Sequence, residues 1–235
     1  ITKQNIDCDY ALTGSFTAAL TESDFDKMKQ EAEFLRKKTG IKTKIITRRM
    51  LPDYIGNIKY VGGISTDSIG TIHPAKLVNG LHKAARQAGG VIHSKTAVLK
   101  IARHSGLFQV ETDRGSCLAG SIVVATTGYT DTSDKWLNKR LVPVKSRILV
   151  TDELSQNFVS SLIPQARAIG ERKKLYRYFR SIPGGKRILM GGREPAWSNN
   201  LDKVIEHGRQ ALINIFPQLK DVGISHSWSG NVAFS

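Results

Sequence analysis

The residues best suited to bind a charged ligand form a basic cluster from Arg172 to Arg187, where seven of sixteen positions are lysine or arginine. An arginine guanidinium can hold a carboxylate or a phosphate through two parallel hydrogen bonds. Tyr178 and Arg180 are two residues apart in an alternating segment, so they share one face of a predicted strand. The cluster therefore indicates either an anion-binding surface or a basic strand that is simply solvated.

The chain carries none of the short motifs that usually mark phosphate-binding, metal-binding or acyl-transfer sites. GxGxxG, GxxxxGKS/T, HExxH, GxSxG and CxxC are all missing from the sequence. The two cysteines, Cys8 and Cys117, lie far apart and form no metal-ligand spacing. Spacing alone therefore predicts no metal, and the catalytic residues remain unknown.

The composition is typical of a globular chain with a large excess of positive charge. Of 235 residues, 40% are hydrophobic and 23% are charged, which argues against a disordered chain or a coiled coil. The 35 lysines and arginines against 20 acidic residues give a net charge of +15, which favours anionic partners. Aromatic residues, at 7%, are few for a protein that stacks single-stranded bases.

The sequence also bears on the compartment. It contains no run of about 18 apolar residues that would predict a transmembrane helix. The first ten residues lack the apolar stretch of a secretory signal. Two widely spaced cysteines are most simply explained in a reducing compartment, so we expect a cytoplasmic protein.

The hydrophobic pattern predicts a mixed α/β (α+β) fold. Amphipathic helices are expected at residues 21–40, 74–88 and 202–216, each bounded by glycine or proline. A run at 121–125 is typical of a strand that is buried on both faces. The other expected strands are residues 42–47, 58–63, 91–93, 96–101, 107–112, 141–151, 174–181, 187–191 and 224–229.

Several segments, taken together and in order, resemble one family of flavoenzymes. GTIHPAKLVNGLHKAARQAGGVIHSKTAVLKI, followed by SIVVATTGYT, carries most of the resemblance. CDYALTGSFTAAL, YVGGI, YRYFRSIPGGKRILMGGRE and HSWSG extend it along nearly the whole chain. The sequence is thus similar to the D-amino-acid-oxidase-like FAD-dependent oxidoreductases, and within them to glycine, sarcosine and γ-glutamylputrescine oxidases.

The resemblance implies that the chain is the middle of such an enzyme. It would contain part of an FAD-binding Rossmann-like domain (61–135) and a mixed, largely antiparallel substrate-domain sheet with helices (1–60 and 136–227). Residues 228–235 would begin a return to the FAD-binding domain. The family holds the FAD pyrophosphate on a GxGxxG turn and a helix N-terminus, for which this chain has no counterpart. We therefore expect a fragment with weak FAD binding or none.

The same resemblance implies two groups of site residues, although each also has a plainer interpretation as a strand, turn, surface or core residue. The backbone of one strand residue would meet the adenine, and a turn of small residues would let the backbone approach the cofactor. These cofactor-binding positions are Val98, Ala125, Thr126, Thr127 and Gly128. The substrate-binding positions are Tyr178, Arg180, Arg193 and Trp228.

Three further positions, His73, Asn231 and Val232, qualify this assignment. His73 lies in a turn that runs near the flavin in the family, while a helix-capping or surface histidine is the simpler interpretation. Several amino-acid oxidases of the family have a carboxylate-anchoring arginine just after W-x-G, where this chain has Asn231 and Val232. An amine whose carboxylate lies elsewhere, or is absent, therefore fits better than a simple α-amino acid.

These observations lead to one expected function and one alternative. We expect a fragment of an FAD-dependent oxidoreductase that oxidises the C–N bond of a small amine or amino acid by hydride transfer to flavin, giving an imine that hydrolyses. The isolated fragment should be inactive. The alternative is a basic binding module for nucleic acid or an anionic surface, with residues 172–187 as its footprint. The first hypothesis expects no nucleic-acid partner, and the sequence leaves the oligomeric state open.

Overall fold

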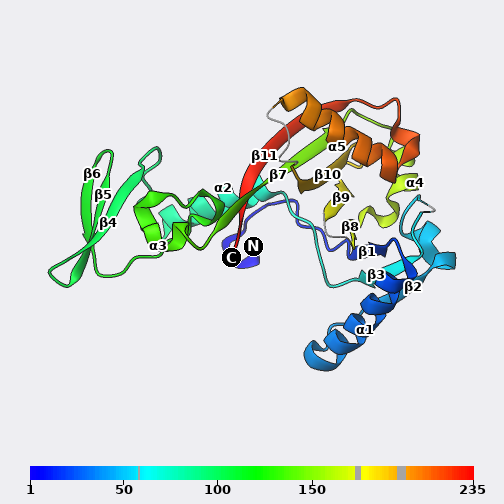
Figure 1. Cartoon of the computed structure of the whole chain (residues 1–235), viewed down its shortest axis with the longest axis horizontal. Helices are drawn as coiled ribbons and strands as arrows, with labels where there is room; N and C mark the ends of the chain where they lie inside the picture. Colours follow the sequence, from blue (N-terminus) through cyan, green and yellow to red (C-terminus); the bar gives the residue numbers. More distant parts are fainter. Residues whose placement is uncertain (58, 173–175, 195–199) are drawn as a thin grey trace. The chain divides into compact units, whose positions relative to one another are not determined.

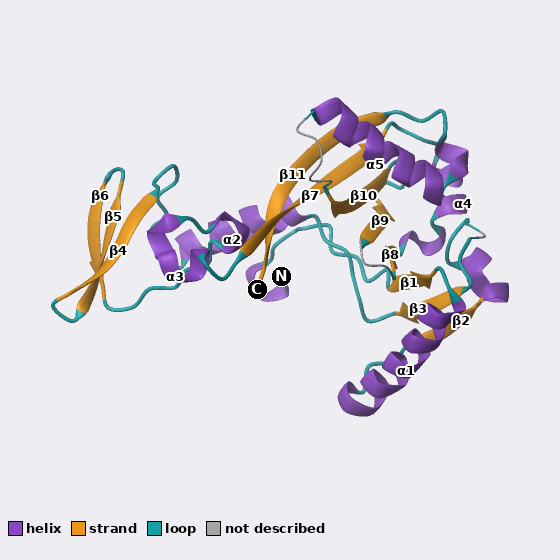
Figure 2. Cartoon of the chain, in the orientation of Figure 1, coloured by secondary structure: helices purple, strands orange, loops and turns teal. Residues whose placement is uncertain are grey.

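The computed structural model describes residues 1–57, 59–172, 176–194 and 200–235. The chain divides into two compact units, Ile1–Leu81 with Arg147–Ser229 and His82–Ser146 with Gly230–Ser235. The fold is mixed α/β, as predicted, with strands and helices interleaved along the chain (Figure 2). The division expected for the complete enzyme, at residues 60, 135 and 227, stays a prediction.

An eight-stranded sheet is the frame of the first unit (Figure 1), and its strand order is β11-β7-β10-β9-β8-β1-β3-β2. β1 pairs in parallel with β8, whereas β1–β3, β2–β3, β8–β9 and β9–β10 are antiparallel. The sheet is therefore mixed and largely antiparallel, as predicted, with β2 at one edge. The strands are β1 (Ser15–Ala19), β2 (Lys44–Thr47), β3 (Gly62–Thr66), β7 (Val142–Thr151), β8 (Ala168–Glu171), β9 (Arg177–Ser181), β10 (Ile188–Arg193) and β11 (Ile224–Phe234).

The three predicted helices are present with nearly the predicted boundaries, and two short ones accompany them. The first begins because the Thr21 side chain accepts a hydrogen bond from the Asp24 N–H, and it ends at Gly40, whose φ is 71°. None of the helices in the described part of the chain is long and apolar enough to cross a membrane. The helices are α1 (Glu22–Thr39), α2 (Pro74–Gln87), α3 (Lys135–Asn138), α4 (Gln156–Leu162) and α5 (Leu201–Ile215).

One face of the large sheet carries the hydrophobic core. Phe16, Ile169 and Phe179 from the central strands are buried there and pack against α4, α5 and the turn Arg48–Asp53. Phe179 meets Phe216 edge to face, with ring centroids 5.3 Å apart. This face is thereby closed to solvent by helices.

On the opposite face of the sheet, the described residues form a small hydrophobic cluster at the β1–β3 end. There, Phe25 and Met28 of α1 pack against Ala19, with Ile64 alongside. The rest of α1 continues beyond the sheet, and its C-terminal end projects away from the strands (Figure 1). This end of the helix therefore lacks the packing that holds its first half.

The second unit is built around a three-stranded antiparallel sheet of β4 (Val98–His104), β5 (Leu107–Thr112) and β6 (Gly115–Ala119). The strand expected at 121–125 is wrong, because residues 121–126 form no strand and Val123 is 89% exposed. The strand expected at 91–93 is wrong as well, and Val91 is 79% exposed. Apolar runs become buried strands only where neighbouring strands pair with them, and no described strand pairs with these two.

The predicted apolar face of α2 is only partly covered in the described part of the chain, where Ile6 packs against Gly80. No residue of α2 is buried, and Val78 and Leu81 are 62% and 52% exposed. The amphipathic pattern was sufficient to predict the helix, but it carries no information about which element covers the apolar stripe.

From the packing of the core, we expect substitutions of two phenylalanines to change the free energy of unfolding by very different amounts. Phe179→Ala removes a fully packed ring and should lower the free energy of unfolding by about 3–5 kcal/mol. Phe34→Ala removes a ring on α1 that is 61% exposed. This substitution should change the free energy of unfolding by less than about 0.5 kcal/mol. Urea unfolding followed by far-UV circular dichroism measures both. Equal losses for the two variants would contradict this account of the core.

Candidate functional site

Strand alternation places three of the predicted substrate residues on the face of the sheet that lies opposite the core. In the β9–β10 pair, Tyr178 lies opposite Gly191 and Arg180 lies opposite Leu189. Phe179 is in the core, so Tyr178 and Arg180 point to the other side, and Arg193 follows Gly191 by two residues. We call this side of the sheet, over β9, β10 and β11, the open face.

Small residues let aromatic rings lie directly on the open face. The Tyr178 ring lies over Gly191, where a Cβ would overlap its Cζ and Oη atoms. Tyr176 lies in the same way over Gly170, and the two tyrosine rings are 5.8 Å apart at their centroids. Burial raises the pKa of the Tyr176 hydroxyl. The glycines thus fix a flat aromatic surface with two hydroxyls beside it.

Arg180 supplies a half-buried cation at the end of this aromatic surface. Its guanidinium donates hydrogen bonds to the carbonyl oxygens of Ser181 (3.1 Å) and Ile72 (3.2 Å). Burial lowers its pKa, while the Asp9 carboxylate opposes that shift. An arginine remains protonated at neutral pH, so the open face keeps a positive charge that is oriented by two carbonyl groups.

Trp228 joins the same side of the sheet from β11. Ser227 accepts a hydrogen bond from Arg147 (2.8 Å), and Arg147 shares the core side of β7 with Leu149. Trp228 follows Ser227 directly, so its indole points to the opposite side, where it is 49% exposed. Alternation therefore brings all four predicted substrate residues to one side of the sheet.

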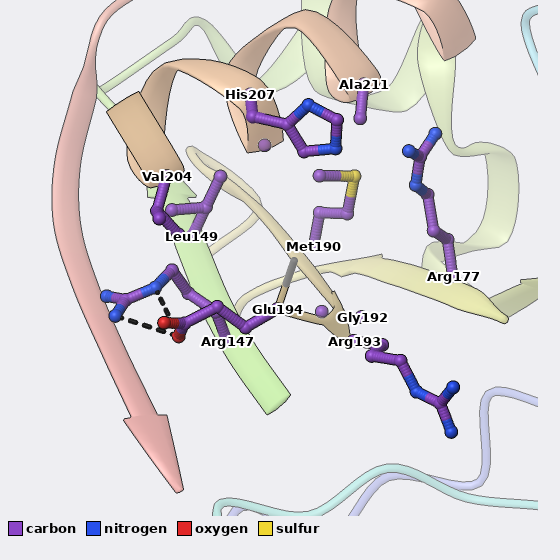
Figure 3. A pocket seen from close by; sticks show the side chains of 12 residues that line it. Arg147, Leu149, Arg177, Met190, Gly192, Arg193, Glu194, Val204, His207 and Ala211 are labelled. Carbon is purple, nitrogen blue, oxygen red and sulfur yellow. Dashed lines mark hydrogen bonds and ion pairs between the residues drawn. The ribbon is translucent and has the colours of Figure 1, made fainter. Parts of the chain in front are cut away.

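The core side of the same strands contains a separate small pocket between β7, β9, β10 and α5 (Figure 3). Arg147 and Glu194 form a nearly buried ion pair in it, with Nε–Oε2 and Nη2–Oε2 distances of 3.0 and 2.9 Å. Arg177 and Met190 point toward α5, whereas Arg193 points away from it (Figure 3). The cavity is about 40 Å³, which is room for water molecules only when the side chains lie as they do here.

The predicted cofactor turn lies in the second unit and contains an unusual backbone conformation. Thr127 has φ 46°, in the left-handed region that β-branched residues rarely occupy. Ala125, Thr126 and Thr127 are exposed, and the Thr126 and Thr130 hydroxyls lie 2.7 Å apart. Backbone strain of this kind is concentrated at ligand-binding sites.

Gly128 and Asn231 connect this turn to the end of the chain. Gly128 is buried, and a Cβ there would lie 2.7 Å from the Asn231 carbonyl carbon. The Asn231 N–H donates a hydrogen bond to the Tyr129 hydroxyl at 3.1 Å. In the sequence, Asn231 stands out only because it replaces an arginine, since a contact between residues about a hundred positions apart leaves no local signal.

Val98, the remaining cofactor residue, is the first residue of β4. It is 37% exposed and pairs with Thr112, and the register shifts between Val98 and Lys100. β4 packs beside Thr132–Asp134, which follow the turn in the chain. The structure therefore places the predicted cofactor residues in the second unit and the predicted substrate residues in the first.

His73 caps a helix in this structure. Its ring Nδ1 accepts from the Lys76 N–H at 3.5 Å in the first turn of α2, and its own N–H donates to the Cys8 carbonyl at 2.7 Å. No cluster of three or more histidine, cysteine, aspartate or glutamate side chains suited to a metal ion occurs in the described residues.

Internal contacts occupy much of the basic cluster. Arg172 forms a bidentate pair with Glu31, with an Nη2–Oε1 distance of 2.6 Å. Arg187 donates to the Thr151 carbonyl oxygen at 2.9 Å, and Lys186 pairs with Glu153 at 3.1 Å. Residues 173–175 lie outside the described part of the chain. These contacts do not favour the alternative of a basic module with residues 172–187 as its footprint.

Comparisons with known proteins identify relatives among oxidoreductases. Gamma-glutamylputrescine oxidoreductase of Escherichia coli (strain K12) is 28% identical over 98% of this chain and 54% of its own length. Probable oxidoreductase OrdL of Rhizobium meliloti (strain 1021) is 32% identical over 77% of this chain and 42% of its own length. The chain thus spans about half the length of the curated relatives that it matches.

Solved structures show the same fold. Glycine oxidase from Geobacillus kaustophilus superimposes with a TM-score of 0.78 at 17% identity, covering 99% of this chain and 62% of that one. L-proline dehydrogenase from P. horikoshii superimposes with a TM-score of 0.80 at 17% identity, covering 97% of this chain and 62% of that one. The family model described as FAD dependent oxidoreductase (DAO) matches residues 1–235. The chain therefore belongs to this family of FAD-dependent oxidoreductases.

Proposed function

We propose that this chain supplies the substrate-binding sheet and part of the cofactor-binding unit of an enzyme that oxidises the C–N bond of a small amine or amino acid. The observation that carries the proposal is the open face, where alternation gathers Tyr178, Arg180, Arg193 and Trp228 on one side of the sheet. The relatives named as gamma-glutamylputrescine oxidoreductase and glycine oxidase support this class of substrate.

The second unit fits one part of FAD. The exposed turn of small residues at 125–127 offers backbone groups that a ligand can approach, and Val98 offers those of a strand end. The chain has no GxGxxG turn, so the FAD pyrophosphate needs a binding segment that these 235 residues do not contain. When bound, FAD supplies the acceptor for the hydride that leaves the carbon next to the substrate nitrogen.

The side chains of the open face would bind and enclose the substrate. Arg180 and Arg193 provide cations that can hold a carboxylate, while Tyr178 and Trp228 wall the site with aromatic surface and exclude water. A neutral amine needs no strong protein base before its C–N bond is oxidised, and the resulting imine hydrolyses in water. The open-face residues that the structure describes are accordingly groups that bind and orient a substrate.

Exposed apolar residues support the proposal that this chain is a fragment of a longer enzyme. Val123 and the α2 residues Val78 and Leu81 are each more than half exposed. Large apolar side chains in a strand-like run and on an amphipathic helix normally pack against another element. A further strand–turn–helix segment that carries GxGxxG would supply both the missing packing and the missing pyrophosphate site.

The cysteines support a cytoplasmic location for this enzyme. Cys8 is buried and Cys117 is exposed, and both are free thiols. An exposed free thiol persists in a reducing compartment, whereas it is open to oxidation and exchange outside the cell.

One prediction of the proposed function concerns the cofactor. After incubation with FAD and desalting, the 235-residue chain should show no visible flavin absorption and no turnover of amines, because it lacks the pyrophosphate-binding turn. An extended product that carries a GxGxxG segment should retain the flavin. Stoichiometric yellow flavin on the 235-residue chain would contradict the fragment proposal.

A second prediction tests the open face with two adjacent glycines. In the extended, flavin-containing enzyme, Gly191→Ala should displace the Tyr178 ring and lower kcat/KM by roughly tenfold to a hundredfold, since small misplacements of positioning groups are costly. Gly192→Ala is the matched control: its Cβ points to the core side, where the nearest atom lies 3.3 Å away. Steady-state kinetics and thermal unfolding compare the variants. Equal effects on kcat/KM would count against the open face.

A further inference from the structure

The end of α1 and the loop that follows it combine positive charge with exposed apolar side chains. In residues 34–45, five of twelve positions are lysine or arginine and none is acidic. We call this segment the basic tip. Its cations are Arg36, Lys37, Lys38, Lys42 and Lys44. Its exposed apolar residues are Phe34 (61%), Leu35 (42%), Ile41 (42%) and Ile45 (44%).

The exposure follows from where the helix loses its support. Phe25, Met28 and Ala32 form the buried stripe of α1, and Leu35 is the next residue in that stripe. Leu35 is nevertheless 42% exposed, because the helix continues beyond the sheet (Figure 1). Phe34 lies on the opposite side of the helix from this stripe. Apolar side chains therefore surround the projecting end instead of forming a single face.

The charges of the basic tip are mostly available to an external partner. Lys37 pairs with Glu33 at 2.9 Å, and both side chains are more than half exposed. Lys44 lies 5.9 Å from the centre of the Tyr54 ring. Within the described residues, Lys38 and Lys42 form no ion pair. A pair as exposed as Lys37–Glu33 is weak in water and is readily exchanged for another anion.

We propose that the basic tip docks this protein on a lipid bilayer with anionic headgroups. Lysines and arginines are attracted to the negative surface of such a bilayer, and exposed apolar side chains between them can enter the boundary between headgroups and acyl chains. Neither step requires a membrane-spanning helix. A projecting tip with apolar groups on several sides suits a soft, deformable interface better than the fixed concave surface of a folded partner.

Co-sedimentation of the whole chain with vesicles tests this proposal. The chain should bind vesicles of phosphatidylcholine mixed with phosphatidylglycerol, should bind pure phosphatidylcholine much less, and should dissociate at high salt. The double variant Lys38→Glu/Lys42→Glu should weaken binding at least roughly tenfold, because each basic residue near the surface contributes to the attraction. Lys203→Glu/Lys220→Glu is the matched control, with the same change in net charge at two exposed positions outside the basic tip.

A second pair of variants distinguishes insertion of apolar side chains into the bilayer from electrostatic attraction to its headgroups. Phe34→Ser/Ile41→Ser keeps every charge and should also weaken binding roughly tenfold, whereas Leu118→Ser on β6, which is 57% exposed, should not. All these positions are exposed, so circular dichroism should show unchanged folding.

Three results would overturn the proposal. One is equal loss of binding in the Lys38/Lys42 variant and in its control, which would indicate attraction by the overall net charge of +15. Another is unchanged vesicle binding by the Phe34/Ile41 variant. The third is binding to heparin or single-stranded DNA that is as tight as vesicle binding and equally sensitive to the Lys38/Lys42 variant, which would indicate a general polyanion site.

Discussion

Side chains alternate across β8, β9 and β10, and this constraint divides the chemistry of the first unit. Phe179 can enter the core only if Tyr178 and Arg180 point the other way, because successive residues of a strand face opposite sides. Burial of Phe16, Ile169 and Phe179 under the helices therefore also fixes which residues form the open face. A shift of one residue in the β9–β10 register would exchange the two sets and destroy both the core and the face.

Local patterns in the sequence accounted for most of the elements. Thr21 and Gly40 marked the two ends of α1, and Pro74 marked the start of α2, because caps and proline act within one helical turn. Strand alternation was enough to predict that Tyr178 and Arg180 share a face. The resemblance to the oxidase family then suggested what that face binds, which no spacing in this chain could have shown.

The errors lie where burial depends on distant partners. Residues 121–125 have the composition of a doubly buried strand, yet Val123 is almost fully exposed. Composition records that a run is apolar, whereas strand pairing depends on which segments are available beside it. The contact of Gly128 with Asn231 and the Arg147–Glu194 pair likewise join residues that are far apart in sequence. The alternating or apolar patterns that predicted the strands could not reveal such pairs.

The edge strand β2 also has a consequence for self-association. An edge strand offers unpaired backbone groups to a strand of any other molecule, which is the usual first step of sheet-to-sheet aggregation. β2 has cations at both ends. Lys42 and Lys44 lie at its start, and Arg48 and Arg49 follow its last residue. Two copies that approached each other edge to edge would bring these cations together, and their repulsion would oppose the pairing. The same charges that can attract an anionic surface thus help to keep copies of this chain apart.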